Sequence, residues 1–273
     1  MKKIIILFSL FFTVSNISCS EKKSVTEKSP APSQFNFTTT TQENLSLVIE
    51  NVGDVTVKSS IPGKAVVTVE KVAVSHSRKK AAELLDKIIS TPEKTREGII
   101  KYRPKFPEIS SSEKVTTNAS FLVPLNRSIP VNVAMAKGKL TVRGIIGTLS
   151  AVLTKDSSAE INSFSGSIEL SCQNGNVFAG NKISSGKIST LKGNITLKLR
   201  EKSLKGDIEL KSTTGDISLQ LLNNPEYSIE INSKAKIVNK SSTIKLPNGR
   251  KSGNKFFLKV TTSGTVTIMP DLW

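Results

Sequence analysis

A five-residue phrase of alternating polar and apolar residues recurs along the second half of the chain. Each copy holds a glycine, a polar residue, a β-branched residue or leucine, another polar residue and a second apolar or small residue, except that Phe178 stands at the fourth position of the copy at Gly175. The copies begin at Gly138, Gly147, Gly166, Gly175, Gly186, Gly193, Gly206 and Gly215. A degenerate copy at 158–161 fills the one double gap, so the mean spacing is about 9.6 residues. This spacing is typical of short strands separated by turns.

The alternation also predicts which side chains face the interior, because successive residues of a strand point to opposite sides. The expected inward row consists of Leu140, Val142, Ile168, Leu170, Ile195, Leu197, Ile208, Leu210, Ile217 and Leu219. The expected outward row includes Lys139, Glu169, Thr196, Glu209 and Ser218.

Two architectures satisfy this alternation, a meander of antiparallel hairpins and a β-solenoid. Hairpins favour Asn-Gly or Asp-Gly turns. Here glycine comes before Asp or Asn instead, at Gly175, Gly193, Gly206 and Gly215. A fixed period of one strand and one corner suits a solenoid. We therefore expect a mainly β fold, a single-stranded β-solenoid (β-helix) of 9–10-residue strand-turn units. Its glycines should occupy corners that need a positive φ or a close backbone approach.

Residues 35–137 are expected to form a small α/β N-terminal cap, followed by repeats and closing strands over 138–269. Helical spacing of apolar residues predicts one helix over about 78–90, with Ser77 as its N-cap and Pro92 just beyond its end. Its apolar stripe comprises Ala81, Leu84, Leu85, Ile88 and Ile89. We expect this stripe to cover an end of the β core.

The N-terminus has the layout of a secretory signal peptide over residues 1–18. The segment Asn16-Ile17-Ser18-Cys19 resembles a bacterial lipobox, with Asn16 where Leu or Val is usual. It predicts lipidation of Cys19 and attachment to a membrane, and Ser20 favours the outer membrane. Cleavage as an ordinary secreted protein is the alternative. Residues 19–34 lack apolar periodicity, so we expect a tether without secondary structure.

Composition and charge exclude several classes. The chain has 39 basic and 22 acidic residues, a net charge of +17, but the excess is +4 or +5 in each of the segments 35–137, 138–221 and 222–273. Nucleic-acid binders cluster their cations and interleave aromatic residues, so we expect no nucleic-acid partner. One histidine and two cysteines exclude a His/Cys zinc site and a disulfide scaffold. We expect no metal and no cofactor.

No residue predicts catalysis. His76 lacks a partner in sequence, and Cys172 falls on the inward side of its strand as a buried, unpaired thiol. Asp207 and Asp216 occupy equivalent Gly-Asp-Ile phrases, where aspartates are usually turn formers. We expect a protein that is not an enzyme.

Two surface features are candidates for ligand contact. The first is the basic loop with Lys245, Arg250, Lys251 and Lys255, which could contact a polyanion such as anionic lipid headgroups or acidic glycans. The alternative is a solvated hairpin loop. The second is the outward row around Phe178, Lys187, Thr196 and Lys198.

The order of these segments resembles a bacterial β-strand-repeat family described as "putative adhesin", a domain of unknown function related to the head (GIN) domain of auto-transporter adhesins. Residues 45–57 resemble the family's opening strand pair, residues 78–90 its helix and Phe121-Leu-Val-Pro124 its hydrophobic-Pro motif. Residues 253–268 resemble its closing strands. The resemblance covers about 35–269 and implies an exported, repetitive β protein without catalytic residues.

Together these features predict a lipid-anchored envelope or cell-surface protein that acts as an adhesin on a glycan, host-matrix or envelope-protein partner. The alternative is a periplasm-facing component of envelope assembly or signalling that binds a protein. A glycan-active enzyme comes third. Exposure on intact cells distinguishes the first two.

Overall fold

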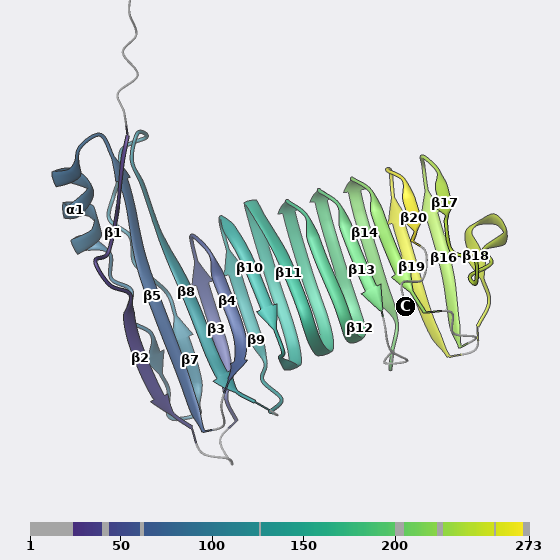
Figure 1. Ribbon diagram of the computed structural model, residues 1–273, viewed down its shortest axis with the longest axis horizontal. Coiled ribbons are helices and arrows are strands. Elements are labelled where there is room, and N and C mark those ends of the chain that lie inside the picture. Colours follow the sequence, from purple (N-terminus) through teal and green to yellow (C-terminus); the bar gives the residue numbers. More distant parts are fainter. Residues whose placement is uncertain are drawn as a thin grey trace, which may run out of the picture.

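A computed structural model of the chain describes residues 24–39, 44–60, 63–125, 127–199, 205–222, 226–253 and 255–269. The described residues form a long row of strands, with one α-helix at the N-terminal end of the row (Figure 1). The predicted signal peptide and Cys19 lie outside the described residues.

The repeats stack in parallel, as a solenoid requires. Strand β12 (Val177–Lys192) lies on β11 (Ile146–Asn174) with Ala159 opposite Val177, and β13 (Ile195–Leu199) lies on β12 with Val177 opposite Ile195. Equivalent residues are 18 apart in these two pairs, 19 apart between β10 (Gly138–Arg143) and β11 and 22 apart between β13 and β15 (Ile217–Leu221), so one coil contains two of the strand-turn units. The prediction of a β-solenoid is confirmed, because hairpins would pair these strands antiparallel.

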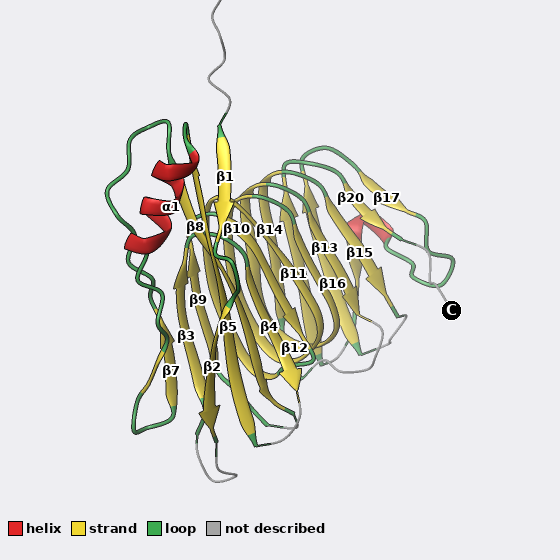
Figure 2. Cartoon of the chain, turned by 60° about the vertical axis from the view of Figure 1, so that its left-hand side comes forward, coloured by secondary structure: helices red, strands yellow, loops and turns green. Residues whose placement is uncertain are grey.

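Two units per coil give the solenoid two faces on either side of a shared interior (Figure 2), and the long strands β11 and β12 run around the corners and join the faces into one continuous sheet. In stacking order, face A comprises β8 (Lys114–Pro124), β4 (Val55–Ser60), β10 (Gly138–Arg143), 157–162 of β11, 177–181 of β12, β13, β15 (Ile217–Leu221), β20 (Val266–Ile268) and β17 (Ile237–Asn239). Face B comprises β7 (Ile99–Tyr102), β3 (Ser46–Asn51), β9 (Val131–Met135), 149–153 and 167–174 of β11, 186–192 of β12, β14 (Ile208–Thr214), β19 (Phe256–Thr262) and β16 (Tyr227–Ser233).

The interior is built mainly from Ile, Leu and Val. All ten residues of the predicted inward row are buried, with exposures of 2% or less. Aromatic rings pack edge-to-face near both ends, where Tyr102 contacts Phe121 and Tyr227 contacts Phe256. The period-two alternation therefore predicted the core correctly.

The corner glycines stack on one another from coil to coil. At Gly193 φ is +149°, and a Cβ there would lie 2.1 Å from the carbonyl oxygen of Gly175 in the preceding coil. A side chain would force the two coils apart. Ser157 occupies the equivalent place in the degenerate copy, opposite Gly138.

The N-terminal region extends face A with antiparallel strands. Strand β5 (Lys64–Ser75) pairs with β8, and both β1 (Val25–Lys28) and β2 (Ser33–Thr38) pair with β5. The short β6 (Glu93–Lys94) pairs antiparallel with β7. The tether predicted over 19–34 is therefore wrong for its second half. Alternation in Val25–Lys28 is too short to be recognised alone, and this strand exists because β5 offers it an edge.

Helix α1 (Arg78–Lys87) confirms the predicted helix, and the Ser77 side chain caps it by accepting a hydrogen bond from the Lys80 N–H at 3.2 Å. Its apolar side packs on β5 and β1 in a cluster separate from the solenoid interior (Figure 2). Ile89 does not belong to this stripe and is 61% exposed, because the helix ends before it and Ile89 bridges to Lys105 instead.

The parallel stack begins upstream of the predicted repeat region. Strands β3 and β4 form a coil that lies between β7 and β8 on one side and β9 and β10 on the other, all in parallel. Consequently the position 137/138 is no break in the sheets, and part of the predicted cap continues the solenoid.

The C-terminal coils do not stack in sequence order. The coil of β19 and β20 lies between that of β14 and β15 and that of β16 and β17, although it follows both in the chain (Figure 1). Before it, η1 (Pro247–Gly249) leads into β18 (Arg250–Lys251), which pairs antiparallel with β16.

Candidate functional site

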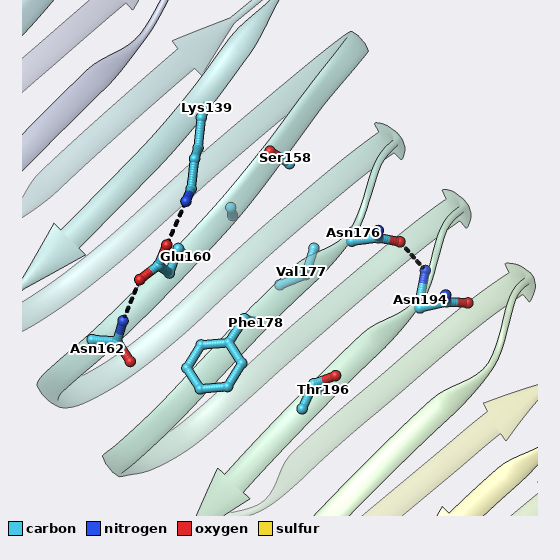
Figure 3. A pocket seen from close by; sticks show the side chains of 10 residues that line it. Lys139, Ser158, Glu160, Asn162, Asn176, Val177, Phe178, Asn194 and Thr196 are labelled. Carbon is cyan, nitrogen blue, oxygen red and sulfur yellow. Dashed lines mark hydrogen bonds and ion pairs between the residues drawn. The ribbon is translucent and has the colours of Figure 1, made fainter.

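A groove of about 610 Å³ opens on the outer surface of face A (Figure 3). Strand pairing places Glu160, Phe178 and Thr196 side by side on three adjacent strands. The lining residues are Lys139, Ser158, Ala159, Glu160, Asn162, Asn176, Val177, Phe178, Asn194 and Thr196. The groove therefore joins Phe178 and Thr196 of the predicted outward row to Glu160 and Asn162, which the sequence did not single out.

Phe178 forms the apolar floor of the groove. Its ring lies over Gly180 of the same strand, where a Cβ would approach the ring carbon Cε1 to 3.2 Å. Figure 3 shows the ring face-on between Asn162 and Thr196. From the next strand, the Lys198 ammonium lies 5.5 Å from the ring centroid, within cation–π range. Because residue 180 has no side chain, the ring can lie flat on the strand, where it stays half-buried beneath the Lys198 ammonium.

Glu160 is held in place by its neighbours. It forms ion pairs with Lys139 and Arg143, the second at 2.9 Å, and accepts a hydrogen bond from Asn162 Nδ2 at 2.7 Å. The hydrogen bond from Lys139, followed by that from Arg143, lowers the pKa of Glu160, so the carboxylate stays charged. Asn162 thereby presents its Oδ1 over the groove floor near Gly180.

Two asparagines form the corner side of the groove. Asn176 Oδ1 accepts a hydrogen bond from the Asn194 N–H at 2.9 Å (Figure 3), and Asn194 Oδ1 accepts one from the Asp216 N–H at 2.8 Å. These bonds tie successive coils together and fix the orientation of both amides. Each Nδ2 remains as the donor that a ligand could use.

A second groove of about 510 Å³ adjoins the first on face A and shares Asn162 with it. It is lined by Lys58, Ser59, Arg143, Gly144, Asn162, Ser163 and Asn181. Strand pairing places Lys58, Arg143 and Asn162 on three adjacent strands. Face A therefore carries an aromatic groove and a basic groove side by side.

Lys187 of the predicted outward row lies on face B, in a row of alternating charges. Register places Glu169, Lys187, Glu209, Lys259, Glu230 and Arg250 on successive strands. The Lys187–Glu209 ion pair measures 3.2 Å and the Arg250–Glu230 pair 3.1 Å. We call this row the charge ladder. Its charges neutralise one another across the coils.

The predicted basic loop is largely engaged in contacts of its own. Besides Arg250, Lys255 pairs with Glu226 at 2.6 Å, and Lys251 Nζ donates to the Tyr227 carbonyl oxygen at 2.9 Å. Burial lowers the pKa of Lys251. Lys245 is exposed. A polyanion contact at this loop stays a prediction.

The two aspartates are structural. Asp216 Oδ1 accepts a hydrogen bond from the Thr265 N–H at 2.7 Å, and Asp207 Oδ1 accepts one from the Phe257 N–H at 2.9 Å. Both acceptors bind the backbone of the neighbouring coil and not their own turn.

Cys172 is buried, as predicted, and its thiol is free in the described part of the chain. Its thiol points to the Ser157 carbonyl oxygen at 3.1 Å. The hydroxyls of Thr190, Ser212 and Thr262 donate to corner carbonyls in the same way in successive coils. Burial raises the pKa of the Cys172 thiol, which keeps it protonated as a donor.

His76 is exposed at the end of β5, and its Nδ1 lies 3.3 Å from Ser75 Oγ. Ser75 is fully buried and donates to Glu113 Oε1, so its hydroxyl does not reach solvent. Within the described part of the chain there is no cluster of three metal-ligating side chains. Nor does any described helix have the length and apolarity to cross a membrane.

Comparison with known families identifies the fold. The model of the Toastrack DUF4097 domain matches residues 126–268, more than half of the chain. The chain belongs to the Toastrack DUF4097 family. The match covers the groove residues of β11 to β13, so the groove is built on the Toastrack repeats themselves.

Two solved structures are similar to this Toastrack chain at low identity. One, a "putative cell adhesion protein" from Clostridium sporogenes, has 9% identity and a TM-score of 0.37, over 88% of this chain and 100% of that one. The other, a "putative adhesin" from Bacteroides fragilis, has 12% identity and a TM-score of 0.39, over 91% of this chain and 98% of that one. No curated protein matches the chain. A relation to the GIN head domain stays a prediction.

Proposed function

We infer that this protein is a non-enzymatic binding protein of the bacterial cell envelope, anchored by lipid at Cys19 and exposed at the cell surface as an adhesin. The observation that carries the proposal is the groove of face A, a preformed surface with one half-buried aromatic ring and fixed polar groups. Ligand sites combine apolar floors with a few oriented polar groups in this way.

The engagement of the reactive side chains supports a binding role. Asp207 and Asp216 hold neighbouring coils together, Ser75 is buried, and Cys172 fills a corner position. Glu160 is held ionised between two cations, whereas a general acid needs a raised pKa. A rigid sheet that presents fixed groups is well suited to recognition.

The signal-peptide layout and the lipobox-like segment ending at Cys19 support export and anchoring. Cys19→Ala should abolish labelling by a fatty-acid analogue and release the protein from the membrane fraction. Continued labelling of that variant would show that the acyl chain, if any, is elsewhere.

Surface exposure is tested on intact cells. Antibodies raised against the purified protein should label intact cells that express it, and added protease should remove the signal. Permeabilised cells provide the positive control, and a known periplasmic protein provides the control for leakage. Labelling only after permeabilisation would contradict the proposal and support the periplasm-facing alternative.

A further inference from the structure

We propose that the two grooves of face A bind an acidic oligosaccharide, with one sugar ring stacked on Phe178 and a carboxylate group held by Lys58 and Arg143. The proposal deepens the inferred binding function, because it names the ligand class of the same site.

The first step is the half-buried ring of Phe178. The ring lies flat over Gly180 (Figure 3), and the Lys198 ammonium lies over it at 5.5 Å from its centroid, so a stacking sugar has to displace this flexible side chain. The face of an aromatic ring carries partial negative charge and attracts positively polarised groups. The C–H groups on the apolar face of a sugar ring fit this surface, because they are apolar and their hydrogens carry a weak partial positive charge.

The second step is the set of polar groups that surround Phe178. The Nδ2 groups of Asn176 and Asn194 are donors, Asn162 Oδ1 is an acceptor, and the Thr196 hydroxyl can act as either. A ligand without polar groups would desolvate these atoms at a cost of about 1–3 kcal/mol for each. Sugar hydroxyls, which both donate and accept, can pair with every one of them.

The position of the groove disfavours an extended peptide. Peptides commonly bind sheets by adding a strand to a free edge. Strands β11, β12 and β13 are paired on both sides within face A, so their backbone groups offer no such edge. Recognition here has to use side chains.

The third step is charge. Lys58, Arg143 and Asn162 lie in one row on adjacent strands, and Asn162 Oδ1 reaches toward Gly180 of the next strand, which lies opposite Lys198. With strands about 4.8 Å apart, Arg143 is about 10 Å and Lys58 about 14 Å from the strand that carries Gly180. Three cations line the two grooves, Lys58, Lys139 and Arg143. The only carboxylate in the lining is that of Glu160, which already pairs with Lys139 and Arg143. An anionic ligand that spans several strands fits this row, which points to an oligomer.

The test uses the purified full chain in detergent and titration calorimetry. The probes are a hexamer of galacturonic acid and, as the neutral probe, cellohexaose. Wild type should bind the acidic hexamer more tightly than the neutral one. The difference between the two affinities should become smaller as the salt concentration is raised. Phe178→Ala should weaken binding of the acidic hexamer at least tenfold, which is about 1.4 kcal/mol.

Matched charge variants separate the groove from general electrostatics. Lys58→Ser with Arg143→Ser should weaken binding of the acidic hexamer about tenfold, and should weaken binding of the neutral hexamer less. Lys187→Ser with Lys211→Ser removes the same charge from face B and should have no effect. Equal losses for both pairs, or no saccharide binding by wild type, would overturn the proposal.

Polyglutamate tests whether any polyanion suffices. It should bind at least tenfold more weakly than the acidic hexamer, because it offers no ring for Phe178. If polyglutamate binds equally well and Phe178→Ala changes nothing, the site recognises charge alone and the proposal is wrong. None of these measurements depends on cellular location. The saccharide proposal can therefore fail while surface exposure is confirmed, and surface exposure can fail while saccharide binding is confirmed.

Discussion

The two faces of the solenoid share one backbone pattern and differ in their outward side chains. Face B pairs its outward charges with one another in the ladder from Glu169 to Arg250. Face A carries Phe178, oriented asparagines and the cations of its basic groove. The inward residues are apolar on both faces, because both faces pack into the same interior. Apart from the corner glycines and the side chains that tie coils together, the outward positions are where one face can acquire a binding role that the other lacks.

The largest effect should come from charging the shared interior, and it should not depend on the face. Leu197→Asp on face A and Ile208→Asp on face B each bury an unpaired carboxylate, with an expected loss of more than about 4 kcal/mol in the free energy of unfolding. Thermal or denaturant unfolding measures this. Thr196→Asp is the control and should change stability by less than about 0.5 kcal/mol. Similar losses for Thr196→Asp and Leu197→Asp would refute the inward assignment.

Alkaline pH should weaken the face B side of the interior next. Tyr102 on β7 is buried, and desolvation raises its pKa to about 12 from an ordinary value of 10.0. The folded state keeps the proton that the unfolded state releases, so stability is retained below pH 10 and lost between pH 10 and 12. The loss is up to about 1.4 kcal/mol per pH unit. Tyr102→Phe should flatten the unfolding free energy over that range, and an unchanged slope would contradict this origin.

Reversing a charge in the ladder should have a smaller, salt-sensitive effect. Lys187→Glu places three carboxylates in a row with Glu169 and Glu209, which should cost about 0.2–1 kcal/mol at low salt. Unfolding should show that high salt restores stability. Thr196→Glu on face A serves as the control, because it creates no such run of like charges. A loss that persists in high salt would mean that packing, and not charge, is responsible.

The smallest effect should come from the basic loop. Replacing Lys245, Arg250, Lys251 and Lys255 together by Ser should reduce binding of the galacturonic acid hexamer less than Phe178→Ala does, because three of the four already make internal contacts. Titration calorimetry measures both variants. A larger loss of binding in the fourfold variant than in Phe178→Ala would show that the polyanion site lies in the loop and not on face A.

Local alternation was sufficient to predict the interior and the outward direction of Phe178, Thr196, Lys187 and Lys198. It could not assign them to faces, because alternation distinguishes inside from outside but not one sheet from the other. That assignment needs the knowledge that two units make one coil. With that knowledge, Lys187 is assigned to face B and its charge ladder, whereas Lys198 is assigned to face A.

The groove itself depends on contacts between coils. Glu160 and Phe178 are 18 residues apart in sequence and become neighbours only through parallel register. Aligning the degenerate copy at 158–161 with the copy at Gly175 would have found this pair. Strand β1 and the order of the last coils depend on which strand edges are available, which no local pattern records.

The inserted coil has a consequence for how the chain becomes a finished molecule. Solenoids usually grow by adding each new coil to the previous one, so folding can follow synthesis or export from the first end to emerge. Here residues 227–239 have no place to dock until residues 256–268 arrive and fill the position beneath them. A chain interrupted between these segments would leave β15 as an uncovered edge prone to pairing with other chains. Completion of this end therefore depends on the latest-made strands, and maturation of the solenoid must lag behind its translation.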